Sequence, residues 1–228
     1  MHLSKSTTHN IASTLVDSGL IRFDRETKRY HLGPKVAYLG NSFLAGFEIR
    51  DVAQPHLMRL RDLTQETVSL HVRIEHQRTC IAQAISPLPL RRVQELGALR
   101  PLYLGGAGIT LLSGMPPEEV PLYLRKVAIS PLTRYTLTDP EKLLERVVTV
   151  SRDGFFINEQ ESELGVVTVT TPVVDHIGHV TAALVVSGPL PRWDSAAILR
   201  HLGAIQLVTR DISEDLGGRA LTSRLKAG

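Results

Sequence analysis

The chain of 228 residues lacks most of the features that mark a secreted or membrane protein. It contains a single cysteine, Cys80, so no disulfide can form within one copy, as is typical of the reducing cytoplasm. No apolar run reaches the roughly 18 residues that a membrane-spanning helix needs. The N-terminus has no apolar segment followed by a small-residue cleavage site, which argues against secretion. We therefore expect a soluble cytoplasmic protein without a membrane partner.

The chain also lacks a strong charge of either sign. Its 26 lysine and arginine residues and 23 acidic residues leave a formal net charge of +3. A surface that nucleic acid covers entirely usually carries a stronger positive bias, so a nucleic-acid partner would have to meet a local patch. The sequence contains no internal repeat and no low-complexity segment, and its length suits one large or two modest domains.

The start of the chain predicts a short helix. Ser4 is a suitable N-cap, because its hydroxyl can accept a hydrogen bond from a free N–H of the first turn, and Gly19 is a suitable C-terminal stop. Between them, four residues recur at helical spacing and predict a buried stripe. These residues are Thr8, Ile11, Ala12 and Leu15.

A hairpin and a second helix are predicted to follow. Residues 20–23 and 29–32 read as two strands around the turn DRETK. Tyr30 and Leu32 alternate with polar residues, as a half-buried hairpin requires. Pro34 suits the first turn of the next helix. The apolar stripe of that helix, which needs a partner surface to cover it, consists of Val36, Leu39, Phe43 and Phe47.

Short polar and basic side chains remain on the other faces of the first helix. A helix with such residues near its N-terminal end suits the major groove of DNA, where they could contact base edges or phosphates. These candidate DNA-binding residues are Ser4, Lys5, Ser6, Thr7, His9, Asn10 and Ser13. At the hairpin tip, Arg25, Lys28 and Arg29 would hold the adjacent DNA backbone. Composition alone is equally compatible with an ordinary solvated helix and a polar hairpin.

Helices alternate with pairs of strands in the remainder of the chain. The expected helices are 51–65, a helix beginning after the glycines of 102–114, 116–127, 139–153 and 196–215. The expected strands are 66–74, 78–85, 154–158, 165–174 and 179–188. Strands in hairpin-like pairs predict an α+β domain with a mainly antiparallel sheet.

The run DRETKRYHLGP at residues 24–34 is the most specific motif of the chain. Further motifs follow in the order DVAQPHLMRLRDLTQETVSLHV, RPLYLGGAGITLLSG and DGFFINEQESELGVVTVTTPVVDHIGHVTAALVVSGP. Together with the first helix, they resemble the IclR-type bacterial transcription regulators over nearly the whole chain. The resemblance implies a partial winged helix-turn-helix in residues 1–33 and a linker and dimerisation helix in 34–48. Residues 49–228 would form a GAF-like effector-binding domain with a mainly antiparallel sheet.

The resemblance also implies the partners of the protein. They would be double-stranded operator DNA and a small organic-acid effector, and the chain would act as a homodimer or tetramer. Members of the family normally carry two more helices before the recognition helix, about 20 residues at typical lengths, and this sequence starts at the recognition helix itself. We interpret this as a start placed too late or a shortened chain. The alternative is a small-molecule-binding sensor module that has lost autonomous DNA binding.

Carried over by position, five residues would line the effector pocket: Gly106, Ala107, Asn158, Thr168 and Ser187. A helix that begins after a glycine-rich turn favours an anion, although the glycines also suit a simple tight turn. Thr168 stands where the family usually has cysteine, and Asn158 where it usually has aspartate. The loss of an acid would make the site less negative and more apolar. We therefore expect a larger or more apolar acid than the two-carbon acids.

Other motifs do not assemble into a catalytic or metal site. Asp175, His176 and His179 are metal-ligand types, but they lie between two predicted strands and favour a hairpin turn. The GGAGIT run lacks the Lys-Ser/Thr of a phosphate-binding loop, and Ser187 lacks the flanking residues of a nucleophile elbow. We expect no cofactor, no metal and no enzymatic activity.

Overall fold

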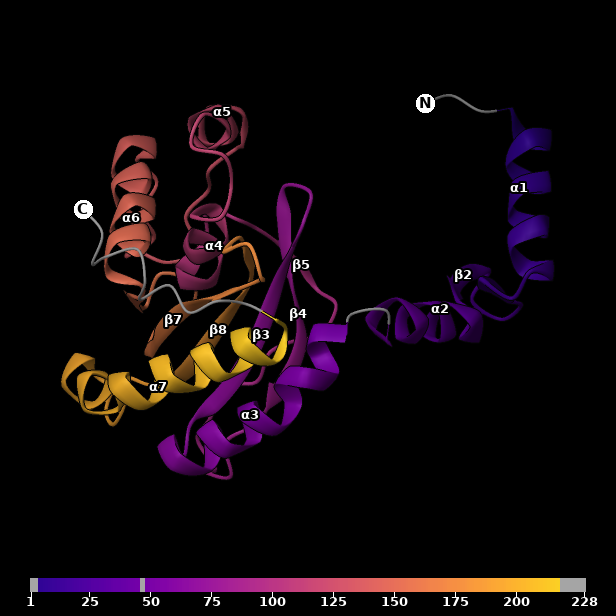
Figure 1. The fold of residues 1–228 in the computed structure, drawn as a ribbon. Coiled ribbons are helices and arrows are strands. Elements are labelled where there is room, and N and C mark those ends of the chain that lie inside the picture. Colours follow the sequence, from indigo (N-terminus) through magenta and orange to yellow (C-terminus); the bar gives the residue numbers. More distant parts are fainter. Residues whose placement is uncertain (1–3, 46–47, 218–228) are drawn as a thin grey trace. The chain divides into compact units, whose positions relative to one another are not determined.

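The computed structural model describes residues 4–45 and 48–217 of the chain. The chain divides into two compact units, Met1–Glu48 and Ile49–Gly228, each with its own secondary structure (Figure 1). Among the described residues, no helix has the length and apolar character needed to cross a membrane.

The first unit begins with helix α1, Lys5–Asp17. Ser4 caps it by accepting a hydrogen bond from the Thr7 N–H at 3.2 Å. Gly19 ends it with a left-handed φ of 74°, and the N–H of Leu20 returns to the carbonyl of Leu15 at 3.0 Å. The predicted start and stop of this helix are therefore confirmed.

The predicted buried stripe of α1 is wrong for this chain. None of the helix residues is buried, and the side chain of Ile11 is 47% exposed. The helix contacts strand β1, Ile21–Asp24, in its own unit. A helix and a short hairpin have too little apolar surface between them to cover the whole stripe.

Strands β1 and β2, Arg29–Leu32, pair antiparallel, with Asp24 opposite Arg29 at the turn. The Asp24 carboxylate accepts hydrogen bonds from two turn N–H groups, those of Glu26 at 2.9 Å and Thr27 at 3.2 Å. The hairpin is thus confirmed, but its predicted half-burial is not. Tyr30 is 52% exposed and Leu32 73%, because no other element of the described unit packs over them.

Two helices follow the hairpin, α2, Pro34–Ala45, and α3, Glu48–Thr64. Pro34 begins α2, as predicted. In the expected stripe, Val36 is half-buried and Leu39 is exposed. The expected contributions of Phe43 and Phe47 lie outside the side chains that the structure describes.

The second unit is built on one antiparallel sheet of six strands in the order β5-β4-β3-β8-β7-β6. The strands are β3 Thr67–Ile74, β4 Gln77–Ala84, β5 Leu99–Pro101, β6 Phe156–Glu159, β7 Val166–Val174 and β8 Val180–Pro189. The mainly antiparallel sheet is confirmed, and every strand except β5 was predicted. Strand β5 has three residues and shows no alternation of its own.

Helices cover both faces of this sheet (Figure 1). Helix α3 and the long helix α7, Ser195–Asp215, lie along one face and are joined by the hydrogen bond between His56 Nε2 and Asp215 Oδ2 at 2.8 Å. The helices α4 Gly105–Leu112, α5 Glu119–Lys126 and α6 Pro140–Asp153 lie on the other face.

The apolar core between α4, α5, α6 and the sheet fixes the start of α4 in place. It includes Leu102, Leu112 and Leu143, all fully buried. The hydroxyl of Tyr123 on α5 accepts hydrogen bonds from the backbone N–H groups of Leu102 at 2.9 Å and Tyr103 at 3.2 Å. These bonds hold the segment just before α4, so the glycine-rich start of that helix has a defined position beside the sheet.

Candidate functional site

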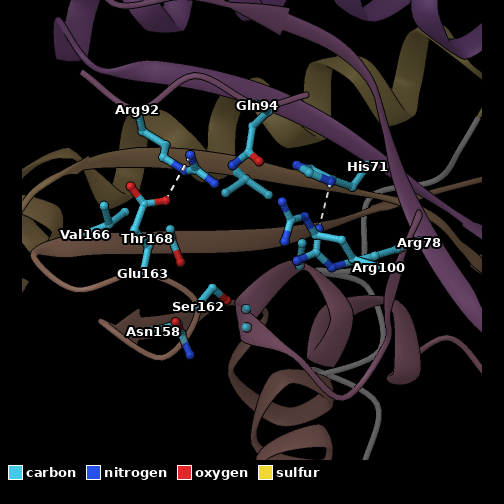
Figure 2. Close-up of a pocket in the computed structure, with 14 residues that line it drawn as sticks. His71, Arg78, Arg92, Gln94, Arg100, Asn158, Ser162, Glu163, Val166 and Thr168 are labelled. Carbon is cyan, nitrogen blue, oxygen red and sulfur yellow. Dashed lines mark hydrogen bonds and ion pairs between the residues drawn. The ribbon is translucent and has the colours of Figure 1, made fainter. Parts of the chain in front are cut away.

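A pocket lies between the start of α4 and the sheet face that α4 covers (Figure 2). The volume open to the centres of water molecules is about 50 Å³, enough for several waters or a small organic molecule. Its walls come from all six strands of the sheet, from the start of α4 and from two loops. The lining residues are His71, Arg78, Arg92, Gln94, Arg100, Gly105, Gly106, Ala107, Asn158, Ser162, Glu163, Val166, Thr168 and Val185.

Four of the five predicted effector residues line this pocket: Gly106, Ala107, Asn158 and Thr168. Ser187 does not. It lies on β8 directly opposite Thr168 of β7, fully buried, and its hydroxyl has no partner among the described residues. Residues that are opposite in an antiparallel pair share a sheet face, so Ser187 lies on the same face as Thr168, although it is not part of the pocket lining.

The glycines at the start of α4 permit a close approach to the sheet. Gly105 has a left-handed φ of 72°, and a Cβ on it would lie 2.5 Å from the Ser162 hydroxyl. A Cβ on Gly106 would lie 2.8 Å from Thr170 Cγ2. Gly108 is required by packing alone, because a Cβ there would lie 2.0 Å from the backbone oxygen of Leu102. The turn therefore brings the first amides of α4 against the pocket.

Those amides are free to bind an anion. The N–H groups of the first helical turn have no partner within the helix. The N-cap residue of α4 is Leu104, whose side chain makes no capping hydrogen bond. The N–H groups of Gly105, Gly106 and Ala107 thus form a positive helix end beside the pocket.

Neutral hydrogen-bonding groups stand opposite this helix end. Asn158 and Thr168 are direct cross-strand partners on β6 and β7. The Asn158 side chain is 3% exposed, and its Nδ2 atom has no partner among the described residues. Leaving such a donor unpaired costs about 1–3 kcal/mol. Thr170 is satisfied by a 2.7 Å hydrogen bond with the Thr110 hydroxyl, so Asn158 and Thr168 are the groups left for a ligand.

Three arginines of the pocket were missed by sequence reasoning. Arg78 on β4 is only 6% exposed and donates hydrogen bonds to His71 Nδ1 and to the Leu104 carbonyl, both at 3.2 Å. Burial, and then the neighbouring charge of Arg100, lowers the pKa of Arg78 to about 10. Its guanidinium is therefore still charged at neutral pH. Arg100 of β5 is its direct cross-strand partner.

His71 is neutral in this arrangement. A guanidinium can only donate, so the Nδ1 atom that receives the hydrogen bond of Arg78 carries no proton. The proton is on Nε2, which donates to the Ser69 hydroxyl at 3.1 Å. Burial, and then the charge of Arg78, holds the pKa of His71 well below its usual value, in agreement with this geometry.

The third arginine, Arg92, forms an ion pair with Glu163 at 2.9 Å (Figure 2). With His71 neutral, three arginines and one glutamate leave an excess of positive charge on the lining. The expected apolar character of the site is therefore replaced by a positive one. Arg78 and Arg100 are brought together by the pairing of β4 with β5. The sequence pattern did not predict β5, so it could not place the two arginines in one site.

The predicted DNA-contact residues form an exposed surface on the first unit. Ser4, Lys5, Ser6, Thr7, His9, Asn10 and Ser13 all lie on α1 or at its cap and are exposed. Arg25, Lys28 and Arg29 lie in the turn of the hairpin or directly after it, also exposed. The Ser4 hydroxyl caps the helix, so it is already occupied by the backbone.

The Asp175–His179 segment is the tight turn between β7 and β8. The Asp175 carboxylate accepts hydrogen bonds from the N–H groups of Ile177 at 3.0 Å and His179 at 2.9 Å. Within the described part of the chain, no three histidine, cysteine or acidic side chains gather where they could hold a metal ion.

One unit with a six-stranded antiparallel sheet that carries a pocket, and a separate unit with a helix and a wing-like hairpin, fit the class of ligand-sensing transcriptional regulators. The model of the bacterial transcriptional regulator IclR C-terminal family matches residues 41–214. The chain belongs to this family, and its second unit is the ligand-binding C-terminal domain.

Its relatives are regulators rather than enzymes. The HTH-type transcriptional regulator BhcR of Paracoccus denitrificans is 28% identical over 226 residues, which cover 96% of this chain and 81% of BhcR. The HTH-type transcriptional repressor AllR of Escherichia coli is 27% identical, with the same shares covered. The crystal structure of Thermotoga maritima IclR is 27% identical and covers 94% of this chain and 87% of its own, with a TM-score of 0.76.

Proposed function

We propose that this chain is a ligand-responsive, DNA-binding transcription regulator whose effector is a small organic acid. The observation that carries the proposal is the pocket between α4 and the sheet. There an uncapped helix end, the unpaired amide of Asn158 and two arginines that pair with no described carboxylate converge on about 50 Å³ of open space. Each of these groups would be stabilised by a bound anion.

In the proposed complex, the effector carboxylate accepts hydrogen bonds from the N–H groups of Gly106 and Ala107. The Nδ2 atom of Asn158 and the hydroxyl of Thr168 complete its shell. A homologue from Microbacterium hydrocarbonoxydans, 22% identical with a TM-score of 0.76, has been crystallised with 4-hydroxybenzoate. That complex concerns the other protein. It supports the proposal only in that this fold can enclose an organic acid.

The DNA-binding half of the proposal rests on the first unit. The exposed residues Lys5, Ser6, Thr7, His9 and Asn10 of α1 would enter the major groove, and Arg25, Lys28 and Arg29 of the hairpin would contact phosphates. The outer residues Ser4 and Ser13 complete this surface. A regulator of this kind works in the cytoplasm, where the bacterial chromosome lies.

Two copies would be needed to read two half-sites of an operator. The exposed Leu39 and the half-buried Val36 of α2 offer an apolar surface for pairing. The effector changes operator affinity only if it binds the DNA-competent and DNA-incompetent arrangements unequally. We propose that occupation of the pocket favours one spacing of the two α1 helices in a homodimer or in a tetramer.

The test is a gel-shift titration on the DNA that adjoins the gene of this protein, at two or more salt concentrations and with a panel of small acids. A shift that weakens with salt and changes with one acid supports the proposal. Absence of any salt-dependent shift, with acid binding intact in calorimetry, favours a second candidate function. That candidate is a sensor module without autonomous DNA binding, and the open apolar stripe of α1 is the observation in its favour.

A further inference from the structure

Two arginines lie side by side in the wall of the pocket, and neither has a counter-ion among the described residues. Arg78 of β4 and Arg100 of β5 are direct partners in the antiparallel ladder, where like charges destabilise a sheet. Arg78 is almost fully buried, and burial of an unpaired charge is among the most unfavourable arrangements in a protein. Both side chains line the pocket (Figure 2).

The surroundings of this arginine pair add positive charge rather than remove it. Arg78 Nη2 donates to the carbonyl of Leu104, the N-cap of α4, and lies 3.9 Å from the position of a Cβ on Gly105. The positive end of the α4 dipole is therefore adjacent to the guanidinium, an unfavourable combination. His71 is neutral, so it cannot balance the charge of Arg78.

No acidic group of the described residues compensates this charge. The ion pairs of the described part of the chain include neither Arg78 nor Arg100. Glu163, the acidic residue of the pocket lining, pairs with Arg92 instead. The Nε atom of Arg78 is buried without a partner. The pocket thus has two separate sets of anion-binding groups, the α4 amides with Asn158 and Thr168, and the Arg78–Arg100 pair.

We propose that the effector of this pocket is a short-chain acid with two anionic groups, such as a dicarboxylate. This inference rests on the proposed acid-binding function and names the class of acid. One carboxylate occupies the amide end, beside Asn158 and Thr168. The second anionic group lies between the guanidinium groups of Arg78 and Arg100.

The spacing of the two sets fits a short molecule. A Cβ on Gly106 would lie 3.4 Å from the Thr168 hydroxyl, and a Cβ on the preceding Gly105 would lie 3.9 Å from Arg78 Nη2. The Cα atoms of Gly105 and Gly106 are neighbours in the chain and therefore about 3.8 Å apart. The amide set and the arginine pair thus lie within a few ångströms of each other, a separation that a short molecule can span. Arg78 is also held in place by His71 and Leu104, so little side-chain freedom is lost when an anion binds.

The test compares dicarboxylates with their monomethyl esters by calorimetry on the full chain at constant ionic strength. Oxalate, malonate and succinate are each measured against the corresponding half-ester, which keeps one carboxylate and nearly the same shape. We expect at least one diacid to bind about tenfold to hundredfold more tightly than its half-ester, as for one charge-assisted interaction. In Arg78→Gln and Arg100→Gln, this ratio falls to near one.

Arg100 is only half-buried, so Arg100→Gln tests the inference independently of any folding defect in Arg78→Gln. A diacid preference that survives both substitutions overturns the assignment of the arginine pair. Equal binding of every diacid and its half-ester by the native chain overturns the dianion inference and leaves the acid-binding function in place. If the native chain binds none of the acids, including the monocarboxylates of the gel-shift panel, the proposed function fails as well.

Discussion

Replacement of Gly106 by alanine tests whether the close approach of α4 to the sheet creates the site. The added methyl group would lie 2.8 Å from Thr170 Cγ2 and 3.4 Å from the Thr168 hydroxyl. Thr170 cannot easily turn away, because it is β-branched and its hydroxyl is bonded to Thr110 at 2.7 Å. Helix α4 therefore has to move. Overpacking of this kind destabilises by about 1–3 kcal/mol.

The displacement should affect stability and binding together. A loss of about 1–3 kcal/mol in the free energy of unfolding lowers the melting temperature by about 2–12 °C for a chain of this size. The first amides of α4 move away from the bound carboxylate, which weakens acid binding by about tenfold or more if one charged hydrogen bond is lost. Urea unfolding measures the first effect, and calorimetry with the best-binding acid measures the second.

Gly203 provides the matched control. It lies inside helix α7, and a Cβ on it has no atom within 4 Å. Alanine at this position should stabilise the chain by about 0.5–1 kcal/mol, because glycine weakens a helix interior, and should leave acid binding unchanged. The reasoning is refuted if Gly106→Ala unfolds at the same free energy as the native chain and binds acid equally well.

Three further outcomes are expected. The fold holds the pKa of His71 well below 6.5, so, as the pH falls, His71 is protonated in the unfolded chain before it is protonated in the folded chain. The free energy of unfolding should then fall between pH 7.5 and 5.5 by up to about 1.4 kcal/mol per pH unit, and His71→Gln should flatten this slope in urea titrations. Arg192→Ala leaves the buried carboxylate of Glu66 without its bidentate partner and should cost about 3 kcal/mol in thermal unfolding, whereas Arg210→Ala on the surface should change less than about 0.5 kcal/mol. Lys28→Ala should reduce the salt dependence of DNA binding by about one unit of slope, and an unchanged slope would remove Lys28 from the contact surface.

Local chemistry made most of the secondary structure predictable. Ser4 and Gly19 set the ends of α1 through a side-chain cap and a left-handed turn. Asp139 begins α6 in the same way, since its carboxylate accepts a hydrogen bond from the Glu141 N–H at 2.9 Å. Such signals involve residues within one turn of each other, so they can be read without knowledge of the fold. Strand β5 was missed because three residues are too few to show the alternation of apolar and polar side chains that marks a strand, and it forms through its pairing with β4.

The pocket was predictable only in part. Gly106, Ala107, Asn158 and Thr168 were placed by resemblance, and all four line the cavity. Ser187 was placed by the same argument and lies on the same sheet face as Thr168, yet it is not part of the lining, because whether a strand residue reaches a cavity depends on what packs over it.

The sequence by itself determined the family, the order of helices and strands, and the glycine-rich start of α4, since these depend on short-range pattern. Only the tertiary structure decided the charge of the pocket. Arg78 and Arg100 are separated by a long loop and meet through the pairing of β4 with β5. The register of these two strands makes Arg78 and Arg100 cross-strand partners, with no acidic partner for either among the described residues. No local segment of the sequence encodes that register.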